Sequence, residues 1–553
     1  MKKILRSITQ KELLLSLLSG LLLGLSWHKP FTFLLFIGFV PLFYLFETTE
    51  ATQQRKLRYL AYFTFVSWNL IAYWWLYYIG IVAFLFAVLA NSFLMLLPTI
   101  LYQYIKRKTT DTFGIAVFVI CWITFEYLHT QDWGFSWTWL NLGNAFGNTP
   151  SWVQWYEYVG VFGGSAWALL INYLIFKTVL PFLGQISPSI SQKALSQTRL
   201  QLALVGVLFI PFGISQWLFY TYQEQGKTVE LVALQPNFDT YTQKFTYNAR
   251  TGGQNTTTYI PFDQQFDIFL KLLRKNVTDK TTVVLLPETA WNQSIDETAI
   301  NADGYITRMK QVRDSFPNLS VLTGADSYQF YYNTAEKPTP TARYHSLNTH
   351  YDVYNSAMFI NSQNDTKFYH KSRLVVGVES NPLRNVIGFL QKTVMQNMGN
   401  LVGDLGVQSE RSVFTTKAGA KLAPVICYES IYGEYVTEYV KKGATVLCVL
   451  TNDGWWDDSP APRQHLSFAS LRAIETRRAV VRSANTGISA FINQKGEVTQ
   501  QSKYNEQVAL RNTVQLNEAI TFYVRFGDVV ALIAMFLTFL CVLLTFNPVK
   551  RTT

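Results

Sequence analysis

The stretch Pro424-Val425-Ile426-Cys427-Tyr428-Glu429-Ser430 passes from apolar residues directly to a thiol, a phenol, a carboxylate and a hydroxyl. The apolar run 422–426 predicts a buried strand, and the change to polar residues predicts that this strand ends at Cys427. In open α/β sheets, functional side chains gather at the carboxyl ends of strands. Cys427 is therefore a candidate nucleophile in an α/β domain.

Two other stretches place a charged side chain in a similar position. In Leu285-Leu286-Pro287-Glu288 a carboxylate follows the apolar run 282–286, and in Phe368-Tyr369-His370-Lys371 a lysine follows a β-rich segment. Short β-rich runs alternate with helical stretches such as 466–478, which is expected to be amphipathic, and this alternation is typical of a layered α/β domain. The remaining predicted strands are 229–234, 321–323, 356–360, 445–450, 479–482 and 488–492.

Glu288, Lys371 and Cys427 together have the groups needed for acyl transfer. A nearby ammonium and a helix N-terminus favour the thiolate form of a cysteine. A carboxylate can remove the thiol proton and return it to a leaving group, and a lysine can stabilise an oxyanion. No metal or cofactor is needed for this chemistry. Each residue alone is more often structural, as a cap, a surface lysine or a small buried thiol.

The composition indicates a membrane protein. Of the 553 residues, 49% are hydrophobic and only 15% are charged, compared with about a quarter charged in ordinary soluble domains. The net charge of +11 does not indicate nucleic-acid binding, because Lys and Arg flank apolar runs and form no basic stripe. The cysteines and histidines lack metal-binding spacings, so no metal site is expected. A disulfide between Cys427 and Cys448 is an alternative that the sequence leaves undecided.

Eight apolar runs approach the length of about 20 residues that a helix needs to cross a bilayer. They divide the chain into a seven-helix transmembrane region (1–225), an α/β domain (226–525) and a C-terminal transmembrane helix with a tail (526–553). The first run follows basic residues but precedes no cleavage signal, which favours a retained helix. The predicted spans are 13–27, 30–46, 60–78, 81–105, 113–128, 159–180, 200–220 and 529–546.

The distribution of Lys and Arg predicts the orientation of these spans. Basic clusters precede the first span, follow the eighth, and lie between spans two and three, four and five, and six and seven. All these clusters fall on one side of the membrane. No Lys or Arg occurs between Lys108 and Lys177, a stretch that includes the connection between spans five and six on the other side. Because basic loops stay in the cytoplasm, both termini are predicted to be cytoplasmic and residues 226–525 to lie outside.

These motifs, in this order, resemble the nitrilase (carbon–nitrogen hydrolase) superfamily, whose hallmark is a Glu–Lys–Cys triad on a four-layer α-β-β-α sandwich. Seven helices before the domain and one after it make the chain similar to the apolipoprotein N-acyltransferase family. Two departures are Val376-Gly377-Val378-Glu379, where the family usually has Pro-Phe-Gly-Glu, and Phe245 in place of a tryptophan. The matching stretches are Pro287-Glu288-Thr289-Ala290, Tyr354-Asn355-Ser356-Ala357, Lys371 with Glu379, Cys427-Tyr428-Glu429, Asn452-Asp453-Gly454-Trp455, Gln464-His465-Leu466, Arg482-Ser483-Ala484-Asn485-Thr486-Gly487 and Trp133-Gly134-Phe135-Ser136-Trp137.

The resemblance implies an acyl transfer in two steps, on the periplasmic side of a bacterial inner membrane. Cys427 would take an acyl chain from a phospholipid such as phosphatidylethanolamine. The α-amino group of a lipoprotein's diacylglyceryl-cysteine would then attack the thioester and complete lipoprotein maturation. The implied catalytic residues are Glu288 as general base, Lys371 as oxyanion stabiliser, Glu379 and Glu429 orienting or tuning the lysine, and Tyr428 shaping the turn of Cys427.

Several alternatives stay open. Segment 382–402 is rich in large apolar side chains and is expected to form a mobile membrane-facing lid, with a packed core helix as the alternative. Trp133 and Trp137 either line a lipid entrance or belong to an interfacial aromatic belt. A membrane-tethered amidase would use the same triad with water as second nucleophile, although the eight helices favour lipid substrates. A transporter or membrane scaffold with a degenerate domain is disfavoured, because transporters usually carry ionisable residues at mid-membrane, whereas Glu126 and Glu157 lie near helix ends.

Overall fold

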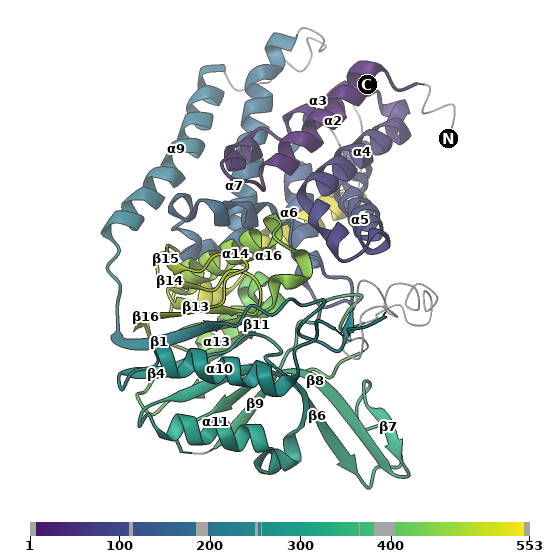
Figure 1. Cartoon of the computed structure of the whole chain (residues 1–553). Coiled ribbons are helices and arrows are strands. Elements are labelled where there is room, and N and C mark those ends of the chain that lie inside the picture. The colour runs from purple at the N-terminus through teal and green to yellow at the C-terminus, as the bar shows by residue number, and fades with distance from the viewer. Residues whose placement is uncertain are drawn as a thin grey trace.

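The chain forms a bundle of apolar helices joined to a layered α/β part (Figure 1). The computed structural model describes residues 7–109, 114–183, 197–248, 253–255, 257–363, 365–380 and 404–546. The predicted lid, 382–402, lies outside these residues. The helices before the strands are α2 (Gln10–Leu25), α3 (Val40–Thr48), α4 (Gln54–Tyr73), α5 (Ile81–Lys108), α6 (Ala116–Thr130), α7 (Tyr156–Val179) and α9 (Gln197–Thr221). Those that follow are α10 (Phe262–Asn276), α11 (Gly304–Asp314), α13 (Gly433–Lys441), α14 (Pro460–Thr476), α15 (Phe522–Phe526) and α16 (Val529–Leu544).

Each of the eight predicted spans falls on helical structure, but the prediction of eight membrane-crossing helices is confirmed only in part. Within the described residues, four helical segments are long and apolar enough to cross a membrane: Phe31–Thr48, Ile81–Lys108, Tyr156–Val179 and Gln197–Thr221. Helices α6 and α16 are apolar but have only 15 and 16 residues. At a rise of about 1.5 Å per residue they fall short of a hydrocarbon core of about 30 Å.

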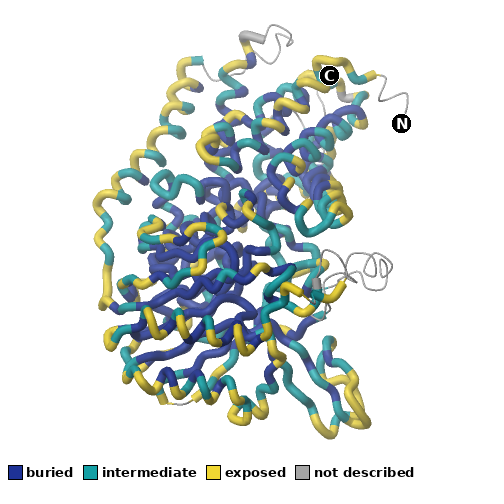
Figure 2. The backbone as a smooth tube through the Cα atoms, viewed as in Figure 1, coloured by how far each residue is buried: buried dark blue, intermediate teal, exposed yellow. Residues whose placement is uncertain are grey.

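Helix α9 shows most clearly that the bundle is built for an apolar surrounding. Only 6% of its most apolar window is buried against the rest of the chain. It lies along one edge of the bundle with exposed residues along most of its length (Figure 2). Its exposed side chains include Leu202, Phe209, Ile210 and Trp217. A contiguous apolar surface of this kind marks contact with a membrane or a partner.

The α/β part contains two sheets that face each other. The eight-stranded sheet has the order β16-β1-β4-β6-β8-β7, with β5 beside β6 and β9 beside β8, and the six-stranded sheet has the order β10-β11-β12-β13-β14-β15. Contacts of β1 with β13 and of β8 with β11 join the two sheets. The strands of the first sheet are β1 (Lys227–Gln235), β4 (Thr281–Leu285), β5 (Trp291–Asp296), β6 (Ser320–Tyr332), β7 (Arg343–Ser346), β8 (Thr349–Ile360), β9 (Thr366–His370) and β16 (Val508–Leu516). Those of the second are β10 (Phe414–Thr415), β11 (Lys421–Ile426), β12 (Val446–Thr451), β13 (Ala479–Ala484), β14 (Ala490–Ile492) and β15 (Val498–Gln501), and a separate pair is β2 (Tyr247–Asn248) with β3 (Gly253–Gln254).

The central strands are buried on both faces, which explains their continuous apolar runs. In β1, Leu231 and Ala233 belong to the core between the two sheets. The alternate residues Val232 and Leu234 belong to a second core beneath α10 and α11. Side chains alternate across a strand with a period of two, so one apolar run supplies both cores. The two sheets lie between two layers of helices, and this arrangement is the predicted four-layer sandwich (Figure 1).

The outer helical layer on the second sheet is also covered by the bundle. Helix α14 contacts α7 and the short helix η4 (Leu142–Asn148) on the side away from the sheet. Nearly all of its residues are buried as a result. The predicted helix within 466–478 is confirmed, but the prediction that it is amphipathic is wrong, because all residues from Gln464 to Thr476 are buried.

Arg477 joins the α/β part to the bundle through a buried ion pair and hydrogen bonds. It follows α14 in the left-handed region, with a φ of 48°. Its guanidinium donates to both carboxylate oxygens of Glu157, each at 2.9 Å, and to Oε1 of Gln154 at 2.7 Å. The side chains of Arg477 and Glu157 are only 2% and 14% exposed. Breaking a buried pair is costly, because one charge then stays buried without its partner.

We expect Arg477→Met to lower the free energy of unfolding by about 3 kcal/mol, the usual cost of breaking a buried ion pair. Thermal or denaturant unfolding of the purified protein in detergent measures this. Arg463→Met is the matched control, since Arg463 lies on the same helix but its pair with Asp458 is 57% and 50% exposed, and such pairs contribute about 0–1 kcal/mol. Equal effects of the two substitutions would contradict the role given to Arg477.

Candidate active site

The structure brings Glu288, Lys371 and Cys427 together between the two sheets. Glu288 follows β4 and Lys371 follows β9 in the first sheet, whereas Cys427 follows β11 in the second. Lys371 Nζ lies 3.1 Å from Glu288 Oε1, and the Cys427 thiol is close enough to Glu288 to lower the pKa of that carboxyl group. All three are at least nine-tenths buried. A thiol, a carboxylate and an ammonium therefore share one enclosed site.

A second carboxylate and an amide complete this cluster. Glu379 Oε1 lies 2.9 Å from Lys371 Nζ, so the ammonium is held between two carboxylates. The amide of Asn355 donates to both Glu288 Oε1, at 2.9 Å, and Glu379 Oε1, at 2.8 Å. The backbone N–H of Asn452 donates to the other oxygen of Glu288 at 3.1 Å. Glu288 thus has a fixed orientation before any substrate arrives.

These contacts keep Glu288 ionised. Burial opposes ionisation, but the Lys371 charge and hydrogen bonds from Asn355, Lys371 and Cys427 outweigh it and lower the pKa of Glu288. Burial also opposes the charge on Lys371, but Glu288 and Glu379 raise its pKa well above the ordinary value. The resting cluster therefore contains a carboxylate that can accept a proton and an ammonium that cannot easily lose one.

The thiol of Cys427 behaves differently from the sequence-based expectation. A neighbouring ammonium was expected to favour the thiolate. Burial, followed by the charge of Glu288, instead raises the pKa of Cys427, and the lowering effect of Lys371 is smaller. Burial therefore favours the protonated thiol, and Glu288 is the neighbouring carboxylate that is placed to accept its proton.

The turn that carries Cys427 is strained and firmly held. Cys427 has a φ of 47°, in the left-handed region that costs a non-glycine residue energy. Its carbonyl accepts a hydrogen bond of 3.2 Å from Nε2 of His465, if the ring is protonated there. Burial opposes ionisation of Asp453, but Arg482 and His465 hold its pKa at about 2. The pairs Asp453–Arg482 and Asp453–His465, at 2.8 and 3.1 Å, thus hold the nucleophile's backbone in place.

Glu429 joins the turn of Cys427 to the segment of Lys371. Its Oε2 accepts from the N–H of Ile426 at 2.8 Å, and its Oε1 accepts from the N–H of Ser372 at 2.8 Å. Ile426 and Ser372 are the chain neighbours of Cys427 and Lys371. The carboxylate is completely buried. Glu429 therefore fixes the distance between two functional segments through their backbones.

Tyr428 connects the site to the bundle, and a further aromatic pair lies within the α/β part. The Tyr428 hydroxyl donates to the carbonyl of Ser136 at 3.1 Å, and its ring stacks on Trp137 with centroids 5.9 Å apart. Phe245, which stands where a tryptophan was expected, lies 6.3 Å from Trp455 in a stacked arrangement. Trp137 therefore packs beside the nucleophile turn, whereas Trp133 is 47% exposed.

Three neighbours of the cluster were given no role from the sequence. Asn355 was quoted only as part of a motif. Lys244 donates to the carbonyl of Glu288 at 3.0 Å and to Oγ1 of Thr289 at 2.8 Å, and burial lowers its pKa to about 8 despite Asp326 and Glu288. Burial also raises the pKa of Asp326 to about 7. The adjacent Phe245 was the only signal for this lysine, because a buried lysine looks like any other in a sequence.

The four cysteines are free, so Cys427 and Cys448 form no disulfide. Cys448 lies on β12, beside the strand that leads to Cys427, and it is fully buried. It serves as a small apolar side chain of the sheet. Cys427 thus keeps a thiol that is free to react.

Two opposed sheets, a buried Glu–Lys–Cys cluster at their strand ends and an attached apolar bundle define a membrane-associated member of the carbon–nitrogen hydrolases. Residues 334–522 match the carbon–nitrogen hydrolase family. Residues 19–174 match the apolipoprotein N-acyltransferase N-terminal domain. The two matches correspond to the α/β part and the bundle.

Full-length relatives give the narrower assignment. An apolipoprotein N-acyltransferase of Chlorobaculum tepidum is 27% identical over 538 residues, covering 95% of this chain and 94% of its own length. Another, from Geobacter metallireducens, is 25% identical over 547 residues, covering 95% and 93%. One from Pasteurella multocida is 25% identical over 452 residues, covering 81% and 78%. This chain belongs to the apolipoprotein N-acyltransferase family.

We expect Asn355→Leu to move the acidic limb of the pH–rate profile to higher pH. The amide lowers the pKa of Glu288, so its loss raises that pKa, and a base must be ionised to act. Losing a hydrogen bond to a charged group costs about 1.5–3 kcal/mol, so the rate on the acidic side falls roughly tenfold or more. Acylation rates measured between pH 4 and 8 test this. Asn301→Leu, at an exposed position, is the control, and an unmoved limb in Asn355→Leu would contradict the assignment of Glu288 as base.

Proposed function

We propose that this chain transfers an acyl chain from a phospholipid to the N-terminal amine of a diacylglyceryl lipoprotein, through a thioester on Cys427. The observation that carries the proposal is the buried cluster of Cys427, Glu288 and Lys371, on a turn that contacts the bundle directly through Tyr428. Family membership supports both the reaction and its acceptor. A phospholipid donor and a lipoprotein acceptor are the partners that follow.

In the first half-reaction, Cys427 Sγ attacks the carbonyl carbon of an acyl ester. Glu288 takes the thiol proton as the sulfur–carbon bond forms. Lys371 lies 3.1 Å from Glu288 Oε1 and supplies a positive charge for the developing oxyanion. The carbon–oxygen bond to glycerol then breaks, and Glu288 returns the proton to the leaving oxygen. A lysophospholipid departs and the acyl chain stays on Cys427.

In the second half-reaction, the α-amine of the acceptor attacks the thioester. Glu288 accepts one amine proton, the carbon–sulfur bond breaks, and the proton returns to the sulfur. Glu379 and Asn355 hold Lys371 and Glu288 in place, Glu429 fixes the two segments, and Tyr428 anchors the turn of Cys427. The product is a triacylated lipoprotein, and the enzyme regains its starting protonation state.

The membrane arrangement follows the same proposal. Residues 1–225 and 526–553 form the membrane part with eight spans, and residues 226–525 form the catalytic domain. The inner bacterial membrane, with the catalytic domain in the periplasm and both termini in the cytoplasm, agrees with the basic clusters on one side of the spans. Both substrates are lipids, so a membrane-held site brings them into a shared, oriented layer.

Intact mass spectrometry tests the acyl capture. Purified protein incubated with phosphatidylethanolamine in detergent should gain the mass of one acyl chain. Cys427→Ala should gain none, whereas Cys448→Ala should gain the same mass as wild type, because Cys448 lies on a neighbouring strand as an apolar core residue. An adduct that survives in Cys427→Ala, or no adduct on wild type, would refute the thioester.

The acceptor is tested in a second stage. A diacylglyceryl-cysteine peptide added to the acylated enzyme should remove the acyl chain from Cys427 and gain that chain as an amide. Buffer alone should release it much more slowly. Equal release with and without the peptide, with free fatty acid as product, would identify a hydrolase such as an amidase instead.

A further inference from the structure

A polar cavity of about 240 Å³ lies where the α/β part meets the bundle. Several apolar helices end or begin at its wall: Thr130 ends α6, and Asp528 immediately precedes α16. Val161 and Phe162, near the start of α7, also line it. The ends of membrane helices mark the boundary of the hydrocarbon region. Because α7 is long enough to cross a membrane and begins beside the cavity, the proposed membrane arrangement places the cavity near the depth of the lipid headgroups.

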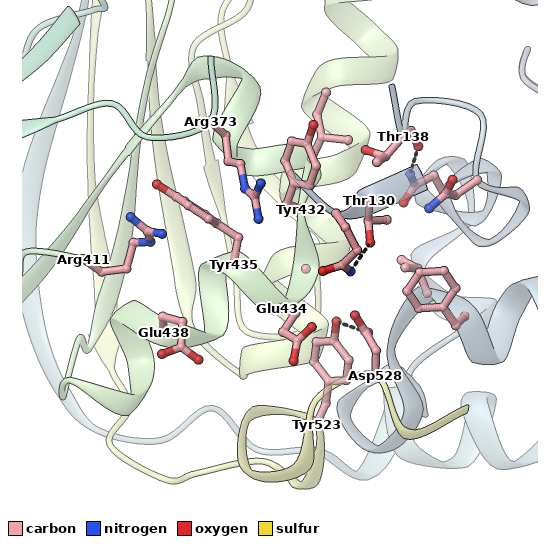
Figure 3. A pocket seen from close by; sticks show the side chains of 17 residues that line it. Thr130, Thr138, Arg373, Arg411, Tyr432, Glu434, Tyr435, Glu438, Tyr523 and Asp528 are labelled. Atoms are coloured by element: carbon pink, nitrogen blue, oxygen red, sulfur yellow. Dashed lines mark hydrogen bonds between the residues drawn. The ribbon is translucent and has the colours of Figure 1, made fainter. Parts of the chain in front are cut away.

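Two arginines from the α/β part face this cavity. Arg373 and Arg411 lie on one side of it near Tyr435, while Glu434, Tyr523 and Asp528 group on the other side (Figure 3). The Cζ atom of Arg411 lies 3.8 Å from the centroid of the Tyr435 ring, and that of Arg373 lies 5.7 Å from it. Two positive charges therefore lie close together, both near the ring of Tyr435.

Both guanidinium groups have donors that the described protein does not satisfy. Nη1 of Arg373 and Nε of Arg411 are buried and lack a hydrogen-bond partner among the described residues. The carboxylate of Asp132 lies 3.2 Å from Nη1 of Arg373, but it is 68% exposed and does not complete a hydrogen bond. Buried donors on charged groups are normally paired. Two such donors beside one cavity indicate an anion that binds there.

The acidic residues of the cavity do not cancel these charges. Glu438 is paired with Lys441 at 2.7 Å. Burial, followed by the charge of Glu434, raises the pKa of Asp528 well above its ordinary value, so Asp528 favours its uncharged form. The Tyr523 hydroxyl donates to Oδ1 of Asp528 at 2.7 Å. On the arginine side of the cavity, the exposed Asp132 is the one carboxylate among the described residues at ion-pair distance from either guanidinium group.

We propose that Arg373 and Arg411 bind the phosphate group of the phospholipid donor, an inference that rests on the proposed function. Arginine is the residue best suited to phosphate, because its planar donors match phosphate oxygens. A volume of 240 Å³ is far above the roughly 10–15 Å³ that one water needs by such a measure. The donor carries a phosphate and the diacylglyceryl-cysteine of the acceptor does not, so this site distinguishes the two lipids.

The phosphate site is connected to the catalytic segments. Arg411 Nη1 donates to Oγ of Ser372 at 2.9 Å, and the N–H of Ser372 donates to Glu429. The Tyr435 hydroxyl, beneath both guanidinium groups, also donates to Glu429. Glu429 in turn holds the N–H before Cys427. A bound phosphate thus contacts side chains that support the segments of both Lys371 and Cys427.

The test separates the two half-reactions in Arg373→Gln and Arg411→Gln. Each substitution removes charged hydrogen bonds, for which about 1.5–3 kcal/mol is typical. The phospholipid concentration for half-maximal thioester formation should therefore rise by roughly ten- to a hundredfold, with the maximal rate within about threefold of wild type. Transfer from a preformed thioester to the diacylglyceryl peptide should not change. Arg308→Gln is the control, since Arg308 also packs over an aromatic ring, Phe266 at 5.0 Å, in an outer helix.

The ratio of the rates with two acyl donors does not depend on the fraction of the protein that is folded. Wild type should use phosphatidylethanolamine in preference to diacylglycerol, which has the same esters without phosphate, and each variant should lose at least tenfold of that preference. Unchanged donor dependence and an unchanged ratio in both variants would overturn the phosphate site. If inorganic phosphate stabilises wild type against unfolding but does not compete with the phospholipid donor for thioester formation, the site binds free phosphate. That result would also overturn the proposed phospholipid site. Failure of wild type to form any thioester would instead count against the proposed function.

Discussion

The buried ammonium of Lys371 is the charge on which the Glu288 and Glu379 carboxylates depend. It lies between Glu288 and Glu379, at 3.1 and 2.9 Å, and is 1% exposed. An isolated buried charge costs several kcal/mol, so each of these groups requires the others. The lysine keeps Glu288 ionised, and the carboxylates keep the lysine charged. Asn355 then bridges the two carboxylates, so that Glu288 is fixed in direction as well as in charge.

The candidate site could be predicted from the sequence where chemistry follows directly from a strand end. Cys427 and Glu288 stand immediately after apolar runs, and Lys371 follows a β-rich one. The state of the thiol could not be predicted, since it depends on the balance between burial and Lys371, and burial wins. Lys244 and Asp326 were missed for a similar reason. Their importance comes from being enclosed beside Glu288, and burial of a lone charged residue leaves no pattern along the chain.

The fold was predictable to a similar extent. Each predicted strand is present, because apolar runs that are buried on both faces are unambiguous in a sequence. The long β6 and β8, by contrast, extend well into polar residues, where pairing between the strands maintains them. The amphipathic prediction for α14 failed because the helix is covered by the bundle as well as by the sheet. Small and polar side chains there, such as Ser470 and Arg472, are buried, and a helical pattern alone does not reveal a second covering layer.

The close contact between bundle and α/β part gives the two halves of the molecule a joint role. Arg477, Tyr428 and the cavity of Arg373 and Arg411 all lie at this boundary. In the proposed reaction, a lipid that enters at headgroup depth meets residues that are connected to the turn of Cys427. The proposed function thus gives the apolar helices two roles beside the hydrolase-type cluster, since they would hold the lipids in place and they form part of the wall of this cavity.

The central claim is that the resting nucleophile is a thiol whose proton passes to Glu288 only during attack. An infrared difference spectrum between wild type and Cys427→Ala, recorded at neutral pH, tests it most directly. An S–H stretching band assigned to Cys427 should be present at rest and should disappear when the enzyme is acylated. Absence of that band in the resting enzyme, together with the ultraviolet absorbance of a thiolate, would contradict the claim.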